Sequence, residues 1–423
     1  MNLRFIHPPM QLRFDYEHSD FKRYKLGELV ENVVAGATPK TSIEEYWNGG
    51  DIPWLSSGEV HKKYIYFTDK FITSEGYNNS STKLIPKDSV LIALAGQGKT
   101  RGTVAINKIE LCTNQSIASI IPNNNLYYKF LFYYLESKYD YLRALSSSDG
   151  GRGGLNLKLI RSIPIKIPSI NEQKNISNFI NSIDKKITLL ERKLNSYQDF
   201  KKYLMQQIFA QKLRFNEFDD EWKTVKLSNV AEIVGGGTPN TEVEEYWNGG
   251  IKWFTPSEIG KTKYISESDR YISEEGLKNS SAKLLPKNTI LLSSRATVGE
   301  ISIALTECST NQGFQSLITK NTVDNEFIYY LISTLKNEFL RRSSGSTFLE
   351  ISKNEIKKIK INIPSLSEQK RISSLFSSID NKIDLLKIEH EKCLCFKKSL
   401  LQQMFNNVRL VLNLIINEHI YHL

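Results

Sequence analysis

The chain has 423 residues, 40% of them hydrophobic, which is enough for two or three packed domains. Lysine and arginine (56) outnumber aspartate and glutamate (46), and the formal net charge of +10 favours a polyanionic partner without requiring one. The four cysteines lack CxxC spacing, which argues against a zinc site and a disulfide framework and favours a reducing, cytoplasmic compartment. No signal core and no apolar run of about 20 residues occurs, so no membrane span is expected.

The chain is one module of about 200 residues written twice. Glu44-Glu-Tyr-Trp-Asn-Gly-Gly50 recurs unchanged at 244–250. Four further motifs recur in the same order, 196 to 200 residues later: Gly36-Ala-Thr-Pro39, Asn79-Ser-Ser81, Thr113-Asn-Gln115 and Ile167-Pro-Ser-Ile-Asn-Glu-Gln173. This period is too long for a solenoid and predicts two homologous domains.

In chain order, a short segment (1–20) precedes a first globular part (21–168) that mixes short apolar runs with Gly, Pro, Asn and Ser. Residues 90–94 predict a buried strand, and 127–144 predict a helix rich in aromatic residues. The second copy repeats this pattern within 222–364, with a strand at 290–292 and a helix at 326–342. Both parts are therefore expected to be α+β domains.

A long helix is expected after each globular part, at 169–211 and 365–405. Its apolar residues recur mostly at spacings of three and four, which is typical of a heptad seam. Forty residues at a rise of about 1.5 Å give a helix of roughly 60 Å. Lys201 and Lys397 interrupt the two seams at matching places. The seam residues of interest are Ile183, Ile187, Leu190, Leu194, Ile379, Ile383 and Leu386.

The linker between the modules (212–221) also repeats, because Leu213-Arg-Phe215 matches Leu12-Arg-Phe14. A tandem repeat that closes on itself gives approximate two-fold symmetry. We therefore expect two long antiparallel, coiled-coil-like helices with one globular domain at each end, followed by a C-terminal extension (406–423).

The ordered motifs resemble those of the specificity subunit of type I restriction–modification systems. They are Gly-x-Thr-Pro, Tyr-Trp-Asn-Gly-Gly, Lys-Leu-Ile-Pro-Lys, Thr-Asn-Gln, and then Ile-Pro-Ser-x-x-Glu-Gln before a long helix. The resemblance covers 21–405, and the ordered set occurs twice. The family pattern usually ends near Met404, so the extension 406–423 departs from it.

The resemblance implies that 21–168 and 222–364 are target recognition domains, each reading one half of a bipartite, asymmetric site in double-stranded DNA. The helices would space the two halves, and their seam residues are candidates for docking two modification subunits. Those subunits would bind S-adenosylmethionine and methylate adenine, and restriction subunits that use ATP and Mg would join them. No catalytic residue, cofactor or metal is implied for this chain, which would be a non-catalytic, DNA-binding subunit.

The loop after the buried strand differs most between the copies and is three residues shorter in the second. Divergent residues between shared strands are expected to contact DNA, because Arg and Gln read base edges whereas Lys and Thr suit phosphates. The candidates are Gln97, Lys99, Thr100 and Arg101 in the first copy and Ser294, Arg295 and Thr297 in the second. An ordinary charged surface loop is the alternative. Shared aromatic residues such as Trp47 and Trp247 are expected in the scaffold.

Two further loops could contact DNA. Ser80 and Lys83, with Ser280 and Lys283 in the second copy, could donate to phosphates or form a plain turn. Arg152, Arg341 and Arg342 lie in Ser- and Gly-rich loops before the strand that leads into each helix. For these arginines, contact with phosphate or a groove competes with a solvated hinge.

Other activities fit the sequence less well. Gly98-Lys-Thr100 lacks the first glycine of a phosphate-binding loop, because Ala93 stands there. No duplicated acid–base or metal constellation occurs, which disfavours an enzyme. A non-catalytic adaptor for a partner other than nucleic acid is the alternative function, but it leaves the basic excess and the long helices unexplained. The DNA sequence, the assignment of half-sites to domains and the spacer length stay open.

Overall fold

The computed structural model describes residues 21–96, 99–145, 154–345 and 349–406. The chain divides into two compact units, one of residues 1–190 with 389–423 and the other of residues 191–388. This division runs through both long helices. Each unit therefore contains one globular domain together with part of the helix from each sequence repeat. The N-terminal segment, Gln97, Arg152 and the extension 407–423 lie outside the described residues.

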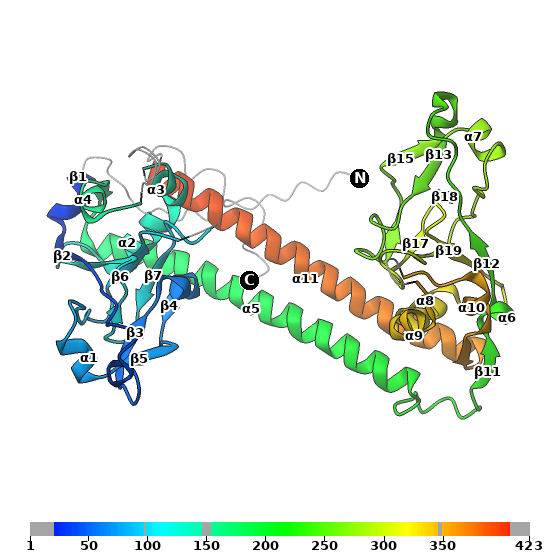
Figure 1. Ribbon diagram of the computed structural model, residues 1–423, viewed down its shortest axis with the longest axis horizontal. Helices are drawn as coiled ribbons and strands as arrows, with labels where there is room; N and C mark the ends of the chain where they lie inside the picture. Colours follow the sequence, from blue (N-terminus) through cyan, green and yellow to red (C-terminus); the bar gives the residue numbers. More distant parts are fainter. Residues whose placement is uncertain (1–20, 97–98, 146–153, 346–348, 407–423) are drawn as a thin grey trace, which may run out of the picture. The chain divides into compact units, whose positions relative to one another are not determined.

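The first unit holds three sheets (Figure 1). The five-stranded sheet has the order β2 (Val30–Ala35), β9 (Ile117–Pro122), β6 (Val90–Ala93), β7 (Val104–Asn107) and β4 (Tyr64–Ile65). The three-stranded sheet has the order β5 (Lys70–Ile72), β3 (Ile52–Leu55) and β8 (Cys112–Thr113). β1 (Lys22–Lys25) pairs antiparallel with β10 (Pro164–Ile167). All four residues of β6 are buried, as the apolar run at 90–94 predicted.

The second unit repeats this topology sheet by sheet. Its five-stranded sheet has the order β12 (Ala231–Gly235), β19 (Gln315–Thr319), β16 (Ile290–Leu292), β17 (Ile301–Ala304) and β14 (Tyr264–Ile265). The three-stranded sheet has the order β15 (Arg270–Ile272), β13 (Trp247–Phe254) and β18 (Ser309–Thr310). β11 (Lys223–Lys226) pairs antiparallel with β20 (Lys360–Ile363). The sequence repeat is therefore a structural repeat.

Short helices complete each domain. In the first unit they are η1 (Leu26–Glu28), η2 (Glu44–Tyr46), η3 (Ser57–Lys62), α1 (Ser74–Asn78), α2 (Tyr128–Ser137), α3 (Tyr139–Leu145) and α4 (Leu157–Arg161). In the second they are α6 (Leu227–Val230), η4 (Glu244–Tyr246), α7 (Glu274–Lys278), α8 (Asn325–Ser333), α9 (Lys336–Arg342) and α10 (Lys353–Lys358). The aromatic helices predicted at 127–144 and 326–342 are each divided in two, because Lys138 and Thr334 end α2 and α8.

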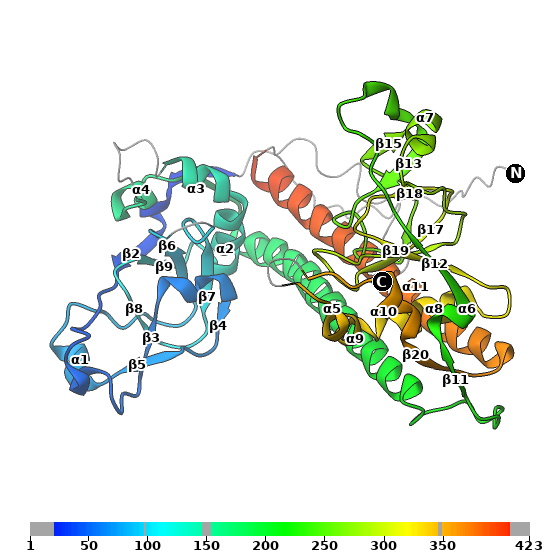
Figure 2. The same ribbon diagram turned by 45° about the vertical axis from the view of Figure 1, so that its right-hand side comes forward.

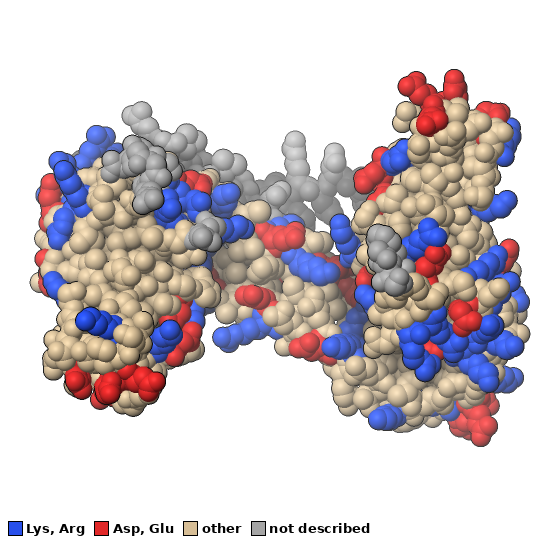
Figure 3. Space-filling view, in the orientation of Figure 1, with Lys and Arg blue, Asp and Glu red and all other residues tan. Residues whose placement is uncertain are grey.

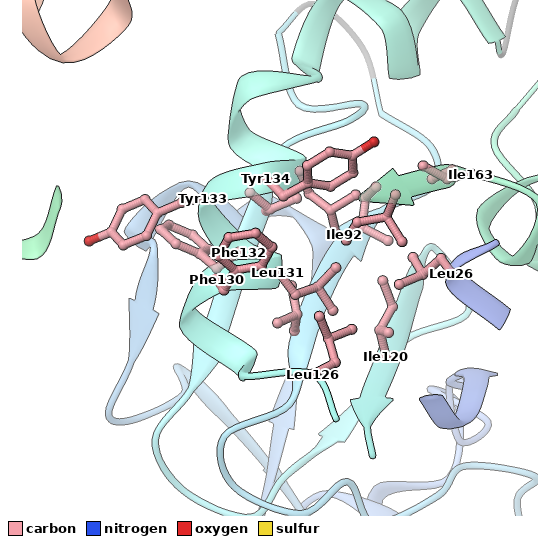
Figure 4. Close-up of a cluster of buried hydrophobic side chains, with 14 of the residues drawn as sticks. Leu26, Ile92, Ile120, Leu126, Phe130, Leu131, Phe132, Tyr133, Tyr134 and Ile163 are labelled. Atoms are coloured by element: carbon pink, nitrogen blue, oxygen red, sulfur yellow. The ribbon is translucent and has the colours of Figure 1, made fainter. Parts of the chain in front are cut away.

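The main core of each unit forms around α2 or α8. Phe130, Phe132 and Tyr133 of α2 are fully buried and pack with Ile92 and Ile120 of the five-stranded sheet (Figure 4). In the second unit Phe327 and Tyr330 of α8 take the same position. Helices α2 and α8 are therefore apolar on almost every side, because the sheet covers one face and the long helices cover another. In the second unit, the three-stranded sheet lies on the side away from the long helices (Figure 2).

The two long helices are α5 (Ile170–Phe209) and α11 (Leu366–Asn406), of 40 and 41 residues. Within the first unit Asp184 of α5 pairs with Lys397 of α11, and Lys186 pairs with Glu389, so the helices run antiparallel. Within the second unit Lys201 of α5 pairs with Asp380 of α11, and Phe209 stacks on Phe376, so the helices are antiparallel there as well. The expected α+β architecture with duplicated domains and paired long helices is therefore confirmed.

The repeated Glu-Gln step at the start of each long helix has a structural reason. Gln173 is fully buried; its side-chain oxygen accepts the backbone N–H of Tyr127 at 2.8 Å and its amide donates to the Pro168 carbonyl at 3.0 Å. Gln369 makes the same two bonds, with Asp324 at 2.9 Å and Pro364 at 2.9 Å. A buried amide satisfied on both ends fixes where each long helix leaves its domain.

Candidate DNA-contact site

Three loops meet at one end of each five-stranded sheet. The β6–β7 loop (94–103) begins where Leu94 donates to the Ser116 carbonyl at 2.8 Å, and Leu155 donates back to the Leu94 carbonyl at 3.2 Å. In the second unit Ser294 donates to the Gly313 carbonyl at 2.7 Å, and Ile351 donates to Ser294 at 3.1 Å. The divergent loop is thus bonded on one side next to the Thr-Asn-Gln turn and on the other to Leu155 or Ile351, which follow the Ser- and Gly-rich segment in the sequence.

The Gly-x-Thr-Pro segment crosses the Thr-Asn-Gln turn in both domains. A Cβ on Gly36 would come within 1.9 Å of the Thr113 carbonyl oxygen, and a Cβ on Gly236 within 2.0 Å of the Asn311 carbonyl oxygen. Only glycine permits this approach of two backbones. The crossing is bridged by side chains: Thr38 donates to Gln115 at 2.6 Å, and Thr238 donates to Gln312 at 2.5 Å.

The tryptophans shared by both copies bind the backbone of the Gly-x-Thr-Pro segment at this crossing. Trp54 donates its indole N–H to the Ala37 carbonyl at 3.0 Å, and Trp253 donates to the Gly237 carbonyl at 2.9 Å. Trp47 packs edge-on against Trp54 with ring centroids 5.0 Å apart, and Trp247 does the same against Trp253 at 5.2 Å. These rings hold the backbone in place and contribute to the scaffold.

In the first domain, the structure places Lys99 exposed and Thr100 and Arg101 half-buried on the β6–β7 loop. The hydroxyl of Tyr139 on α3 donates to the Lys99 carbonyl at 2.8 Å, which anchors the far side of this loop. Gln97 and Arg152, the other candidates here, lie outside the described residues.

Ser80, Lys83, Ser280 and Lys283 lie in the turns after α1 and α7. Ser80 donates to the Tyr77 carbonyl at 3.3 Å, and the Ser280 hydroxyl accepts the backbone N–H of Ala282 at 3.2 Å. Both serines therefore serve the turn itself, whereas Lys83 and Lys283 are exposed. The turn also touches the crossing, because a Cβ on Gly237 would meet the Ser281 hydroxyl at 2.3 Å.

In the second domain the β16–β17 loop presents Arg295 at a tight turn. Thr297 donates to the Arg295 carbonyl at 2.6 Å, and Ala296 between them has a φ of 60°. Few non-glycine residues adopt this backbone conformation, which marks local strain. The structure departs from the sequence-based expectation at Ser294, whose side chain is fully buried beneath the loop. A buried hydroxyl cannot reach DNA, so Ser294 supports the loop through its backbone.

Acidic residues hold the arginines of this domain. The Arg295 guanidinium lies 2.7 Å from Glu350, and Arg341 and Arg342 both pair with Glu338, at 2.6 and 2.5 Å. The hydrogen bond from Arg342 has the largest effect on the pKa of Glu338, and together with the bond from Arg341 it outweighs burial and holds that pKa below its usual value. These ion pairs orient the arginine side chains. To contact DNA, each guanidinium must either break its ion pair or bind DNA while it keeps the ion pair.

Gln115 and Gln312 are not among the residues that the sequence singled out for DNA contact, yet both side chains are exposed. Each accepts a hydrogen bond from a threonine through its side-chain oxygen, which leaves the NH₂ group available. An oriented amide donor beside the divergent loop is suited to contact DNA. The repeated Thr-Asn-Gln motif contains both glutamines, but nothing in the motif itself indicates that their side chains are exposed.

The seam residues of the long helices face inward. Leu190, Ile379, Ile383 and Leu386 are buried, and Ile183, Ile187 and Leu194 are half-buried. Their side chains hold the chain together and offer little surface to another subunit. The outward positions are different: Leu189 is 53% exposed, and Leu385, its equivalent in the second repeat, is 63% exposed.

Two features of the described residues bear on other classes of function. Across 21–96, 99–145, 154–345 and 349–406, histidine, cysteine, aspartate and glutamate form no group suited to hold a metal ion. Within the same residues, no helix has the length and apolar character needed to cross a membrane.

Comparison with known proteins decides the family. The sequence pattern of the type I restriction modification DNA specificity domain matches residues 18–197 and again 219–393. The chain belongs to this family. Each matched segment covers one globular domain and most of the long helix that follows it.

The relatives that the chain resembles include specificity subunits of type I restriction enzymes. The MjaIX specificity subunit of Methanocaldococcus jannaschii is 39% identical over 175 residues, which is 40% of each chain. The EcoR124I/EcoR124II specificity subunit of Escherichia coli is 24% identical over 368 residues, 80% of this chain and 89% of the relative.

Solved structures of the family share the fold. A chain from a study of complex assembly in the type I R-M system aligns with a TM-score of 0.60 at 18% identity, over 92% of this chain and 98% of that one. The S subunit from M. genitalium aligns with a TM-score of 0.59 at 17% identity, over 94% and 99%.

Proposed function

We propose that this chain is the non-catalytic specificity subunit of a type I restriction–modification complex and reads a bipartite, asymmetric site in double-stranded DNA. Each domain contacts one half of the site through its divergent loop and the loops tied to it. The observation that carries the proposal is the duplicated loop cluster. One shared framework of glycine, threonine, glutamine and tryptophan supports two loops that differ in length and residues.

The asymmetry of the site follows from the asymmetry of the loops. The first domain offers Lys99, Thr100 and Arg101, whereas the second offers Arg295 and Thr297. An arginine can donate two hydrogen bonds to guanine, and lysine and threonine suit phosphate or single acceptors. Two different readers in one chain select two unrelated half-sites, whereas a homodimeric reader favours a palindrome.

The partners are two modification subunits, joined by restriction subunits. Leu189 and Leu385, exposed at equivalent positions of α5 and α11, offer each modification subunit the same apolar contact. S-adenosylmethionine, ATP and Mg belong to those partner subunits, so this chain supplies recognition and scaffolding and leaves the reactions to them.

The test is to co-express the chain with its modification subunit and map adenine methylation across a genome by long-read sequencing. A motif of two short halves with a fixed unread gap supports the proposal. Replacing 21–168 with the matching domain of a relative should then change one half and leave the other. Methylation at a single uninterrupted motif, or methyl transfer by the purified chain alone, would contradict it.

A further inference from the structure

Each domain carries an exposed basic surface outside the loops described above, here called its basic face. It consists of the two-stranded sheet and the short helix before the second strand of that sheet. Its exposed cations in the first unit are Arg23, Lys25, Lys158 and Lys166. In the second unit they are Lys226, Lys353, Lys357, Lys358 and Lys360, and Figure 3 shows blue side chains gathered over this region.

The two-stranded sheets place like charges directly opposite each other. Arg23 faces Lys166 across the β1–β10 pair, and Lys226 faces Lys360 across the β11–β20 pair. Like charges opposite one another destabilise an antiparallel pair. Ile165 and Ile361, which alternate with the facing cations, are buried, so Arg23, Lys25 and Lys166 share the solvent face of the first sheet and Lys226 and Lys360 share that of the second. An unfavourable arrangement present in both domains points to an anion that neutralises it.

Acidic neighbours do not explain these cations. Within the described residues, Lys358 pairs with Glu355, and no other cation of the two basic faces forms an ion pair. The charges have also moved between the repeats: Lys360 stands where the first copy has Pro164, and Lys166 stands where the second has Asn362. Positive charge is kept on the surface while its positions change, which suits a diffuse polyanion better than one fixed partner group.

The basic face continues directly from the loop cluster. Leu155, bonded to the β6–β7 loop, is followed by Asn156, whose side chain caps α4 by accepting from Leu159 at 2.9 Å. Ile351, bonded to the β16–β17 loop, is followed by Ser352, which caps α10 by accepting from Glu355 at 3.3 Å. A duplex bound by the loops would therefore lie next to α4 in the first domain and α10 in the second.

We propose that the basic face of each domain binds the phosphate backbone of the duplex flanking the bases that the loops read. This inference rests on the proposed function and deepens it. The loops select the sequence, whereas the basic faces supply affinity that does not depend on sequence and set the register of each domain. Each neutralised phosphate releases counterions, so these contacts weaken steeply with salt.

The test uses the complex of the full chain with its modification subunits. The variant Lys226→Gln/Lys360→Gln removes the facing pair, and Lys261→Gln/Lys287→Gln removes two exposed lysines elsewhere in the same unit as a matched control. Loss of two phosphate contacts lowers the slope of log affinity against log salt by about 2. The loss should be equal on cognate and unrelated duplexes, and the methylated motif should stay unchanged.

Folding does not confound this comparison, because removing a like-charge pair does not destabilise the sheet, and the melting temperature checks it. A salt slope equal to that of the control overturns the inference. So does an unchanged DNA affinity with lost assembly in size-exclusion chromatography, which would assign the face to an acidic protein surface. Failure of the proposed function shows separately, as the absence of a bipartite motif with the unsubstituted chain.

Discussion

The ammonium group of Lys397 on α11 lies 2.7 Å from the carboxylate of Asp184 on α5, and its side chain is only 7% exposed. The same lysine reaches Glu136 of α2 at 2.8 Å. The second repeat builds the equivalent contact with exchanged helices, because Lys201 of α5 pairs with Asp380 of α11 at 2.5 Å. Lys201 also lies over the ring of Tyr330 on α8, 5.2 Å from its centroid, so each domain is contacted by a lysine from the long helix of the other repeat.

Replacing Lys397 with methionine should destabilise the first unit. The substitution keeps the apolar length but leaves Asp184 and Glu136 without their shared cation, at a cost of about 2–3 kcal/mol because both carboxylates retain some solvent. The fraction of buried Cys112 that reacts with a thiol reagent at each urea concentration measures unfolding of this unit. The same measurement at buried Cys308 follows the second unit. Lys398→Met, one residue along on an exposed position, should change neither. Equal loss from both variants would contradict the account.

Acid should weaken the same contact. Burial favours the protonated form of Glu136, but Lys397 and Lys63 outweigh it and hold its pKa below the ordinary value of 4.5. A depressed pKa in the folded state contributes stability that is present above pH 4.5 and is lost as the pH falls through the folded value. The urea midpoint of the first unit should therefore depend less on pH in Glu136→Gln. A parallel pH dependence in both proteins would refute the assignment.

The backbone crossing in the second domain should not tolerate a methyl group at Gly236. Gly236→Ala places a Cβ 2.0 Å from the Asn311 carbonyl, and relief of this overlap costs about 1–3 kcal/mol and displaces the Thr-Asn-Gln turn. Gly250→Ala is the control, since nothing lies within 4 Å of its Cβ. We expect the first variant to lose methylation at the motif and the second to retain it. Retention by Gly236→Ala would show that the crossing is dispensable.

Arg295 should determine one base in one half of the site. Its replacement by alanine removes a guanidinium at the turn of the β16–β17 loop, and a lost bidentate contact costs about 1–3 kcal/mol of discrimination. The mapped motif should become degenerate at a single position in one half only, while Lys287→Ala leaves it intact. Uniform weakening across all sequences would instead make Arg295 a phosphate contact.

The outward leucine of α11 should matter for assembly and the inward one for stability. Leu385→Ser removes an exposed side chain and should weaken binding of a modification subunit by about 1.5–3 kcal/mol, with unfolding unchanged. Its neighbour Leu386 is buried, so Leu386→Ser should lower the free energy of unfolding. Calorimetric titration and denaturation separate the two effects. Identical behaviour of the two variants would argue against docking at Leu385.

Much of the architecture could be predicted because duplication and periodicity are local properties of a sequence. The repeated motifs at Gly36 and Gly236 predicted two homologous domains, and the spacing of Ile183, Ile187 and Leu190 predicted a long amphipathic helix. Spacing alone could not say which face of the helix is left for a partner. The inward seam and the outward Leu189 and Leu385 became distinct only once the opposing helix was in place.

The sequence by itself determined the family, the two α+β domains, the long helices and the loops that diverge between them. Tertiary structure decided which polar residues are accessible: Ser294 is buried, whereas Gln115 and Gln312 are exposed and oriented by threonine. Lys201 and Lys397 interrupt the apolar seam in the sequence. The tertiary structure showed that each forms an ion pair with an aspartate of the opposite long helix. The physical reason is that burial and ion pairing depend on residues far away in the chain, such as Asp184 for Lys397, which only folding brings within hydrogen-bonding distance.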